Sequence, residues 1–336
     1  MENTPVISVC VANYNGEDVI ADCIDSILQQ ESAPPFEIIV HDDASTDKSL
    51  QVLENYDSVR IIESSENVGF CISNNRMVDR ARGSFVLLLN NDAQLFENAL
   101  HTLFAASRRY DDKVVLGLPQ YDAKDRKLVD RGLRLDFFGS TVPVVRHTED
   151  DIAMVIGACL WAPRNLWTRI GGLPDWFETI AEDVYFCCYA RLIGFKVFVP
   201  EGSGFLHIIG HSLGGGKPEE KGLQISVRRR FLSERNRMFI QWLFYPAWLA
   251  PFTTIVNLAI LLVEAAVLSI VNRNASLIFS IYIRSQIDAC RTLNKVIASR
   301  RRIMRSRELS FRTFFGAFVF FPQKLRLLFS FGIPKT

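Results

Sequence analysis

The chain predicts an α/β fold with a mainly parallel central sheet, on two observations. Four apolar runs have the length and composition of strands: residues 6–12, 36–41, 59–62 and 85–89. Helical patterns separate them, at residues 19–28 and 71–81, and Ser45 is placed to cap a further helix that ends at about Asn55. Strands that are apolar throughout are buried on both faces, which is typical of a parallel sheet covered by helices.

Composition narrows the class of protein. The 336 residues carry 38 basic and 37 acidic side chains, so no attraction of the whole protein to nucleic acid is expected. The seven cysteines form no CxxC pair, which favours buried thiols in a reducing compartment over a disulfide framework. The first residues lack the basic start and apolar core of a signal peptide, and a cytoplasmic catalytic part is therefore expected.

Polar clusters follow three of the expected strands, at residues 13–15, 42–47 and 90–92. Ligands of open α/β sheets bind beyond the carboxyl ends of the strands, so these clusters should converge. A carboxylate at Asp42 or Asp43 can accept the imide hydrogen of a uracil or thymine ring, or it can favour the start of the next helix. Asp92 suits a divalent cation that phosphate oxygens and water also bind, although an ordinary Asx turn explains it equally well.

Two later signals have the same double interpretation. Glu182 and Asp183 follow Trp176 and open a helix-like run, so an acid there is either a general base with a raised pKa or a helix N-terminal carboxylate. His207 follows a strand-like run at residues 197–199, and taken alone it is a packed or capping histidine as readily as a ligand. Neither signal identifies a function without its neighbours.

The order of the motifs resembles the family 2 glycosyltransferases over residues 6–240. The motifs that carry the resemblance are residues 9–15, 26–30, 37–47, 66–70, 73–76, 81–83, 89–92, 157–158, 170–172, 182–183, 194–197 and 207–210. Within that family the chain is most similar to rhamnosyltransferase-like members of bacterial polysaccharide assembly.

The resemblance implies a GT-A fold and a set of site residues. Nucleotide-binding positions would be Ala12, Asn13, Tyr14, Asp42, Asp43, Asn67, Gly69, Asn75 and Asn91. Mn²⁺ or Mg²⁺ would be held by Asp92 and His207, and Asn90 stands where a DxD motif has its first acid, which lowers the expected affinity for metal. Asp183, preceded by Glu182, would be the catalytic base, and the sugar or acceptor would meet Gly157, Ala158 and Trp176.

The resemblance also implies the reaction. An inverting, metal-dependent glycosyltransferase would move a sugar from dTDP-rhamnose or a UDP-sugar to a hydroxyl of a lipid-linked or polysaccharide acceptor. The expected organisation is a GT-A domain at 1–240, with a nucleotide-binding half at about 1–118 and an acceptor half at about 119–240. A helical membrane-associating region would occupy 241–336, at the cytoplasmic face of the inner (plasma) membrane.

The expected membrane region contains a stretch of 20 residues, 252–271, that is long enough to cross a bilayer as a helix. Glu264 lies within it and would cost roughly 2.5–3.5 kcal/mol at the bilayer centre. Since both flanks are basic, we favour an in-plane or re-entrant segment over a single span. The arginines of residues 300–307 suit anionic headgroups, a lipid diphosphate acceptor or a solvated helix face. The phenylalanines of residues 311–321 suit an interfacial anchor or a buried dimer interface.

Three other functions compete with this interpretation. A processive membrane synthase would carry a QxxRW motif, which residues 235–242 lack. A nucleotidyltransferase would need a basic, glycine-rich loop near the N-terminus, and residues 13–17 have no basic side chain. A catalytically inactive relative that acts as a membrane scaffold would be expected to have lost Asp92 or Asp183, and both are present.

Overall fold

The computed structural model describes residues 4–148, 152–208, 215–219 and 222–331. The chain divides into two compact units, one made of Met1–Leu133 and Pro143–Ile208, the other of Arg134–Val142 and Ile209–Thr336. Residues 222–240, which the sequence placed in the first domain, thus group with the C-terminal unit. Ile209 and Gly210, the end of one expected motif, lie outside the described residues.

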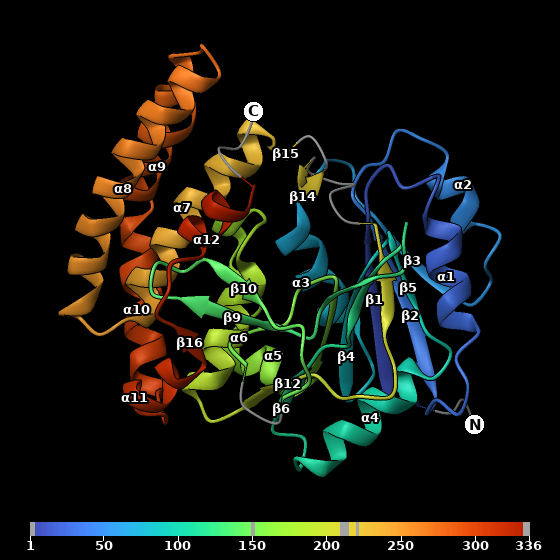
Figure 1. The fold of residues 1–336 in the computed structure, drawn as a ribbon. Coiled ribbons are helices and arrows are strands. Elements are labelled where there is room, and N and C mark those ends of the chain that lie inside the picture. Colours follow the sequence, from blue (N-terminus) through green and yellow to red (C-terminus); the bar gives the residue numbers. More distant parts are fainter. Residues whose placement is uncertain (1–3, 149–151, 209–214, 220–221, 332–336) are drawn as a thin grey trace. The chain divides into compact units, whose positions relative to one another are not determined.

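The first unit is built on a seven-stranded sheet of order β12-β6-β11-β4-β1-β2-β3 (Figure 1). Its strands are β1 Ile7–Asn13, β2 Phe36–Asp42, β3 Val59–Glu63, β4 Phe85–Asn90, β6 Val114–Leu116, β11 Cys159–Pro163 and β12 Lys196–Phe198. The predicted mainly parallel sheet is confirmed, with one exception: β11 runs antiparallel to both of its neighbours, β4 and β6. All four strands predicted in the first ninety residues form within one or two residues of the predicted ends.

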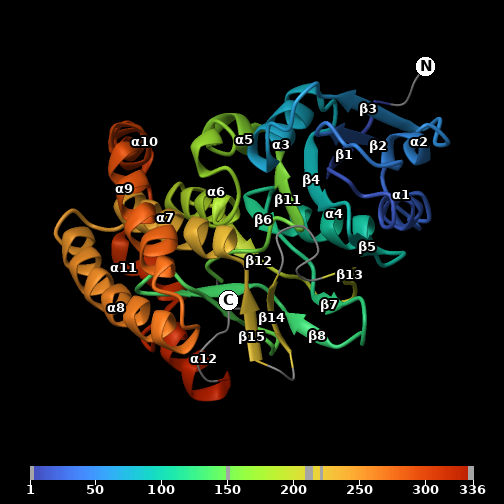
Figure 2. The ribbon, with the colours of Figure 1, turned by 90° about the horizontal axis from the view of Figure 1, so that it is seen from above.

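Helices cover both faces of this sheet (Figure 2). One face carries α1 Ile20–Leu28 and α4 Ala99–Arg109, and the other carries α3 Phe70–Arg80, α5 Arg164–Ile170 and α6 Glu182–Leu192. The amphipathic pattern decides which side of a helix is buried: α1 buries Ile20, Cys23, Ile24 and Ile27, which recur at helical spacing. All seven cysteines are free thiols, six of them buried and Cys290 exposed.

The helix expected after Ser45 differs from the prediction. Helix α2 spans only Ser49–Leu53, and its first turn is not capped by Ser45. The Ser45 hydroxyl instead donates to Asp42 at 2.6 Å and accepts the amide of Asn15 at 2.9 Å. The prediction of a cap was therefore wrong, because Ser45 joins two loops at the edge of the sheet.

A four-stranded sheet of order β5-β13-β7-β8 completes the first unit. Its strands are β5 Ala93–Leu95, β7 Gln120–Asp122, β8 Leu128–Asp130 and β13 Phe205–His207. Because β13 pairs with β5 in a register that sets His207 opposite Ala93, it brings His207 beside the end of β4. The sequence placed His207 after the strand of residues 197–199, whereas it is the last residue of a separate strand.

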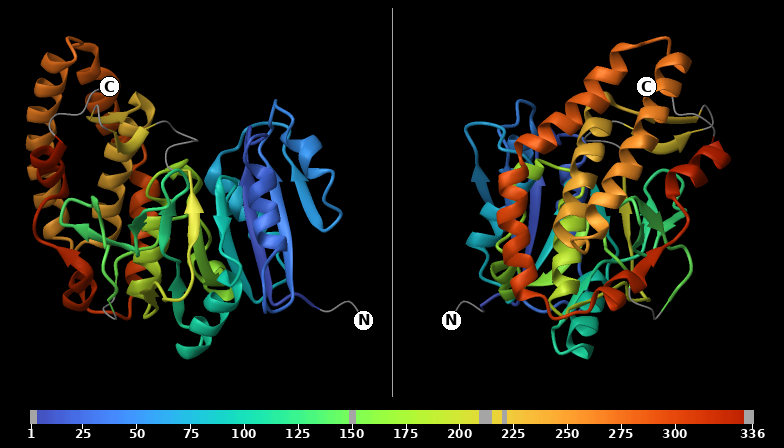
Figure 3. Two further views of the ribbon diagram at one scale, coloured as in Figure 1. Left: turned by 45° about the vertical axis from the view of Figure 1, so that its right-hand side comes forward. Right: turned by 90° about the vertical axis from the view of Figure 1, so that its left-hand side faces the viewer.

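The C-terminal unit is mainly helical (Figure 3). Helix α7, Val227–Phe244, is followed by α8, Leu249–Val271, and the chain then returns along α8 and α7 through η2 Ile278–Ile283, α9 Arg284–Arg291 and α10 Leu293–Ser306. Among the described residues α8 alone is long and apolar enough to cross a membrane, with mean hydropathy 2.4, a property that also suits a helix of a soluble protein.

The remaining elements of the two units are short, apart from α12. They are η1 Asp175–Phe177, β9 Leu133–Asp136, β10 Thr141–Pro143, β14 Gly215–Glu219, β15 Gly222–Ile225, α11 Phe311–Phe314, η3 Phe315–Ala317, β16 Phe318–Val319 and α12 Gln323–Phe331.

The phenylalanine run near the C-terminus is partly an internal packing element. Phe315 and Phe318 lie against Phe137 and Tyr245, with ring centroids 5.2–6.1 Å apart. Phe314 is fully buried, whereas Phe320 is 88% exposed. The expectation of an anchor or a dimer interface therefore cannot apply to the whole run, because three of its rings build the core of this unit.

Candidate active site

The carboxyl ends of β1, β2 and β4 are joined by side-chain amides. The Asn13 amide donates to the Asp42 carboxylate at 2.9 Å, and its oxygen accepts the Asn91 amide at 2.9 Å. The parallel register creates this arrangement, since Asn13 lies opposite Asp42 and Ala12 lies opposite Asn90. The polar clusters expected to converge at residues 13, 42 and 91 do so, and all three side chains are buried.

Gly16 permits the closest approach in this cluster. A Cβ atom at Gly16 would lie 2.4 Å from the Asn13 oxygen and 2.4 Å from the Asn91 nitrogen, so a larger residue would displace both amides. The neighbouring Tyr14 is 51% exposed, and its ring is free to meet a ligand at the rim. The sequence did not single out Gly16, because glycine is common in polar loops. Its close contact with Asn13 and Asn91 becomes visible only when the ends of the strands are placed side by side.

Asp43 holds the loop that contains Asn67. Its two carboxylate oxygens accept the backbone amides of Val68 at 2.7 Å and Gly69 at 2.8 Å. Gly69 has φ +86°, a conformation that favours glycine, and the side chain of Asn67 is exposed. Each carboxylate oxygen retains a second lone pair, so Asp43 can still accept a hydrogen from a base while it orders this loop.

The side chain of Asn75 is hydrogen-bonded to the backbone of a neighbouring loop. Its amide donates to the Leu173 carbonyl at 2.7 Å, and its oxygen accepts the Leu173 amide at 2.9 Å. This two-way pairing holds the segment that leads to Trp176, a partly exposed ring 4.8 Å from the Phe177 ring. Asn75, expected to touch nucleotide, thus has its polar atoms turned to a neighbouring loop.

Asp92 and His207 form a compact pair. His207 Nε2 lies 3.2 Å from Asp92 Oδ1, and its Nδ1 lies 3.0 Å from the Gln120 amide. Asp92 Oδ1 is buried and accepts no hydrogen bond, although it lies this close to His207 Nε2. A carboxylate oxygen beside an imidazole nitrogen fits a divalent cation, and Mn²⁺ accepts both ligand types.

The protein supplies few ligands for a metal ion beside Asp92 and His207. Among the described residues, no group of three or more histidine, cysteine, aspartate or glutamate side chains is arranged to hold a metal ion. A cation held by Asp92 and His207 would complete its shell with diphosphate oxygens and water, as Mg²⁺ and Mn²⁺ sites at nucleotides commonly do. The donor set therefore fits a metal that binds together with the nucleotide.

Asp183 lies at the first turn of α6. Its carboxylate accepts the Gly157 amide at 3.1 Å and the Val184 amide at 2.7 Å. Loss of water around this carboxylate raises its pKa above the usual aspartate value, and the two amide hydrogen bonds oppose that rise only in part. Ala158 continues the connection, since its carbonyl accepts the Asn90 amide at 3.1 Å.

The segment before Asp183 has an unusual backbone. Glu178, Ile180 and Ala181 have φ between +63° and +68°, a region that β-branched and bulky residues seldom adopt. The segment leads from Trp176 to Glu182, whose side chain is buried and 6% exposed. Strain of this kind collects at functional sites, and here it sets where α6 begins and thus where Asp183 points.

Two further residues of the site were not expected from the sequence. Gln120 is 4% exposed and holds the far side of the His207 ring, and Asp130 lies opposite Gln120 on the neighbouring strand β8. Burial raises the pKa of Asp130 to about 7, although the hydrogen bond from Gly132 and the nearby His207 both act to lower it. Neither residue stands in a recognisable motif, and only the pairing of β7 with β8 and β13 brings them together.

Comparison with known proteins points to one family. Residues 8–166 match the family model of glycosyl transferase family 2. The match covers 159 of the 336 residues, and it is this segment that is similar to the family. The chain is 30% identical over 157 residues to the poly(ribitol-phosphate) beta-glucosyltransferase of Bacillus spizizenii, covering 45% of the chain and 24% of that protein. It is 35% identical over 92 residues to the putative teichuronic acid biosynthesis glycosyltransferase TuaG of Bacillus subtilis, covering 26% of the chain and 36% of that relative.

Solved structures support the same fold. Residues 1–349 of S. aureus TarS, crystallised in complex with UDP-GlcNAc, align with TM-score 0.53 and 18% identity over 89% of this chain and 83% of that one. GalNAc-T7, crystallised with UDP, GalNAc and Mn²⁺, aligns with TM-score 0.53 and 15% identity over 62% of this chain and 44% of that one. The GT-A-like fold expected from the sequence is thereby confirmed. The chain spans only 24% and 36% of the length of the two bacterial relatives named above.

Proposed function

We propose that this protein is an inverting family 2 glycosyltransferase that uses a nucleotide-diphosphate sugar. The observation that carries the proposal is the position of Asp183. Its carboxylate accepts a hydrogen bond from the Gly157 amide, and the carbonyl of the next residue, Ala158, accepts one from the Asn90 amide. Asp92 and His207 follow at the same edge of the sheet. A base with a raised pKa thus adjoins a pair of groups suited to a diphosphate-bound cation.

In the proposed reaction Asp183 removes the proton from an acceptor hydroxyl while that oxygen attacks the anomeric carbon. The bond from that carbon to the donor diphosphate breaks in the same step, and the diphosphate leaves on the opposite side. Because one base acts and no enzyme nucleophile is used, the configuration at the anomeric carbon inverts. The raised pKa of Asp183 makes it a stronger base than an ordinary aspartate, which helps it to accept a hydroxyl proton.

The donor nucleotide is proposed to lie over the edge formed by β1, β2 and β4. Asp43 would accept the imide hydrogen of a uracil or thymine base, Tyr14 would cover the ring, and Asn91 would meet the ribose or the diphosphate. The loop at Asn67 and Gly69, which Asp43 orders, would close beside the base. Asn75 would act indirectly, by holding the segment that carries Trp176 to the sugar or acceptor.

Mn²⁺ or Mg²⁺ is the proposed cofactor, held by Asp92 and His207. When bound, the ion would act as a Lewis acid that offsets negative charge on the departing diphosphate. This part of the proposal is supported by the buried Asp92 oxygen that accepts no hydrogen bond. It is also in keeping with the crystallisation of GalNAc-T7 with UDP and Mn²⁺.

We also propose that the protein acts in the assembly of a cell-surface glycan, on a lipid-linked or polysaccharide acceptor at the cytoplasmic face of the membrane. The support is the relatives' names, which include a poly(ribitol-phosphate) beta-glucosyltransferase and a teichoic acid poly(glycerol phosphate) polymerase. The donor is proposed to be a UDP-sugar or dTDP-rhamnose. The apolar helix α8 supports a location at the membrane.

A donor screen tests the proposal. The full chain is mixed with UDP-glucose, UDP-GlcNAc, UDP-galactose or dTDP-rhamnose, with Mn²⁺, Mg²⁺ or EDTA, and thermal stabilisation and donor hydrolysis are measured. We expect one nucleotide class to stabilise the protein in a way that needs both metal and Asp92, so Asp92→Ala abolishes it. A folded protein that responds to no donor would instead favour the inactive membrane scaffold.

A further inference from the structure

The neutral overall charge conceals a strong asymmetry. Residues 226–330 contain 17 arginines and lysines against four acidic side chains, so this stretch carries a net charge of +13. Three of those four acids, Glu234, Glu264 and Asp288, are ion-paired within the unit. Since the whole chain has a net charge of +1, the preceding residues are correspondingly acidic. The C-terminal unit therefore presents a surface that suits an anionic partner.

Helix α8 has its polar residues inside and its apolar residues outside. The buried side contains Thr253, Asn257, Leu261, Ala265, Leu268 and Ser269. The exposed side contains only apolar residues, including Phe252 (63%), Ile255 (68%), Leu262 (73%), Val263 (67%) and Ile270 (76%). A surface helix in water normally has the reverse pattern. An uninterrupted apolar strip along a 23-residue helix, about 34 Å long, therefore needs an apolar partner of similar length.

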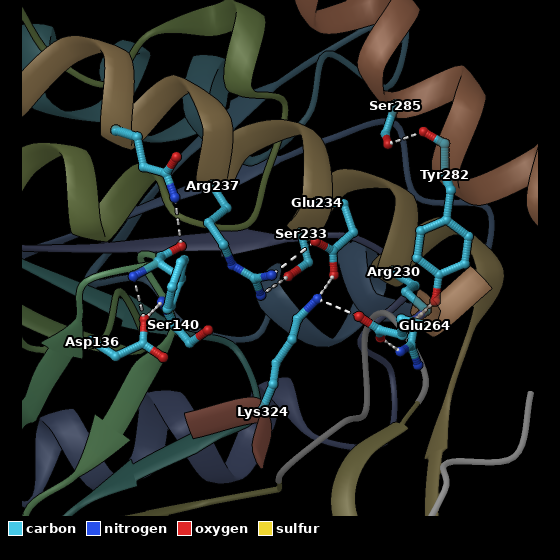
Figure 4. A network of polar contacts seen from close by, with 12 residues as sticks. Asp136, Ser140, Arg230, Ser233, Glu234, Arg237, Glu264, Tyr282, Ser285 and Lys324 are labelled. Carbon is cyan, nitrogen blue, oxygen red and sulfur yellow. Dashed lines mark hydrogen bonds and ion pairs between the residues drawn. The ribbon is translucent and has the colours of Figure 1, made fainter. Parts of the chain in front are cut away.

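Glu264, the only charged residue of α8, is held on the protein side (Figure 4). It forms an ion pair with Arg230 of α7 and accepts a hydrogen bond from the ammonium group of Lys324, on α12, at 2.7 Å. Lys324 also binds Glu234 at 2.8 Å, and Arg237 binds Glu234 at 2.8 Å, so α8 is tied to two other helices. The ion pairs fix the rotation of α8 about its own axis and keep its charge away from the apolar strip.

We propose that the exposed strip of α8 lies in the plane of an anionic lipid bilayer, with its apolar side chains among the acyl chains. Glu264 stays on the protein side of the helix, paired with Arg230 and Lys324. The exposed arginines of this unit, Arg273 at the end of α8 and Arg301 and Arg305 on α10, meet anionic headgroups. This inference extends the proposed membrane location to a particular surface and a particular orientation of α8.

Two other occupants fit the observations less well. A span would carry Glu264 into the hydrocarbon and leave Arg230 and Lys324 buried without it, although the helix is long enough. The turn after α8 is also polar, with exposed Arg273, Asn274 and Ser276. A second copy of the chain would bring two stretches of net charge +13 together, whereas an anionic bilayer complements that charge.

Vesicle binding of the full chain tests the surface. We would measure co-sedimentation with vesicles of phosphatidylcholine alone and of phosphatidylcholine with one quarter phosphatidylglycerol. The double variant Leu262→Ser/Ile270→Ser should bind at least tenfold more weakly to the anionic vesicles than the unsubstituted protein does. The matched control Leu28→Ser/Val145→Ser changes two exposed apolar residues away from α8 and should bind normally. Equal binding by both double variants would overturn the proposal.

A labelling experiment tests the orientation. Asn274→Cys is introduced with Cys290→Ser, which removes the one exposed native thiol, and a membrane-impermeant maleimide is added outside intact vesicles. We expect position 274 to react at once. Reaction only after the vesicles are lysed would show that α8 crosses the bilayer and would overturn the in-plane orientation.

Two controls separate the remaining outcomes. Light scattering in solution shows whether Leu262→Ser/Ile270→Ser changes the oligomeric state. A dimer that becomes monomeric, with vesicle binding unchanged, would assign the strip to a second copy of the chain. Stabilisation of the same variants by donor nucleotide is measured in parallel, so a failure of the transferase proposal is visible separately from a failure of lipid binding.

Discussion

Nε2 of His207 lies 3.2 Å from Oδ1 of Asp92, a buried carboxylate oxygen that accepts no hydrogen bond. The two residues are distant in sequence, and the pairing of β13 with β5 brings them together. A divalent cation between them would satisfy the carboxylate oxygen. This relationship leads to the first two predictions.

Binding of Mn²⁺ should depend on Asp92, His207 and bound nucleotide together. Because two protein ligands make a weak site, we expect UDP to strengthen Mn²⁺ binding, and Mn²⁺ to strengthen UDP binding by the same factor. Titration of Mn²⁺ by electron paramagnetic resonance, with and without UDP, measures this. Asp92→Asn and His207→Ala should remove the coupling, while His101→Ala, an exposed histidine on α4, should keep it. Coupling that survives both site variants would move the metal elsewhere.

Gln120 should tune that metal site without touching the ion. Its amide is 3.0 Å from Nδ1 of His207, so it can hold the ring with Nε2 directed at Asp92. Partners of this kind are typically worth about 10- to 100-fold in metal affinity. Gln120→Leu should weaken Mn²⁺ binding in the presence of UDP by about that factor, whereas Gln120→Glu, whose carboxylate can accept a hydrogen from Nδ1, should retain it. Similar losses in both variants would indicate a packing role alone.

The sequence predicted the strands of the central sheet well, because β1 to β4 are short, continuously apolar and bounded by polar loops. It also placed Asn13, Asp42 and Asn91 together, since the carboxyl ends of neighbouring parallel strands must meet. It failed at Ser45, where a capping residue proved to bind the neighbouring loop instead. Local propensity and tertiary hydrogen bonding competed there, and the tertiary contact prevailed.

Residues that depend on pairing between distant strands escaped prediction. Gln120 and Asp130 lie on three-residue strands whose register carries no signal in a single sequence. The same holds for Glu264, which hydropathy alone places in the middle of an apolar helix. Its partners Arg230 and Lys324 belong to helices before and after α8, and only the folded unit shows which way the carboxylate points.

Replacement of Asp183 should separate catalysis from binding. Asp183→Asn keeps the size of the side chain but cannot accept the acceptor proton, so we expect kcat to fall by about 10² to 10⁴ while donor affinity stays within about threefold. The protein should also become more stable at neutral pH. The raised pKa means that ionisation of Asp183 is less favourable in the folded than in the unfolded chain, so its stability contribution declines as pH rises above about 4. Turnover assays and melting curves measure both effects.

Gly16 should be required for nucleotide binding. A methyl group at this position would lie 2.4 Å from the side-chain tips of Asn13 and Asn91 and would break their hydrogen bond. We expect Gly16→Ala to weaken UDP binding by at least tenfold, measured by calorimetry. Gly316→Ala is the control, because a Cβ atom there meets no other atom within 4 Å and the residue has no positive φ. Equal affinities for UDP would show that the amide cluster does not contact the donor.

Asp130 should make the stability of the first unit depend on pH. Burial raises its pKa to about 7, so the folded chain retains a proton that the unfolded chain releases near pH 4. The unfolded state therefore binds fewer protons between those values, and the free energy of unfolding should fall as pH rises from about 4 to about 7. Asp130→Asn can still accept the Gly132 amide at this position but does not ionise, so the variant should lose less stability over that range. Urea unfolding at pH 5 and pH 8 compares the two proteins, and Asp57→Asn on an exposed turn is the matched control. Parallel losses in wild type and Asp130→Asn would mean that Asp130 is already ionised in the folded protein, with the charge of His207 outweighing the cost of burial.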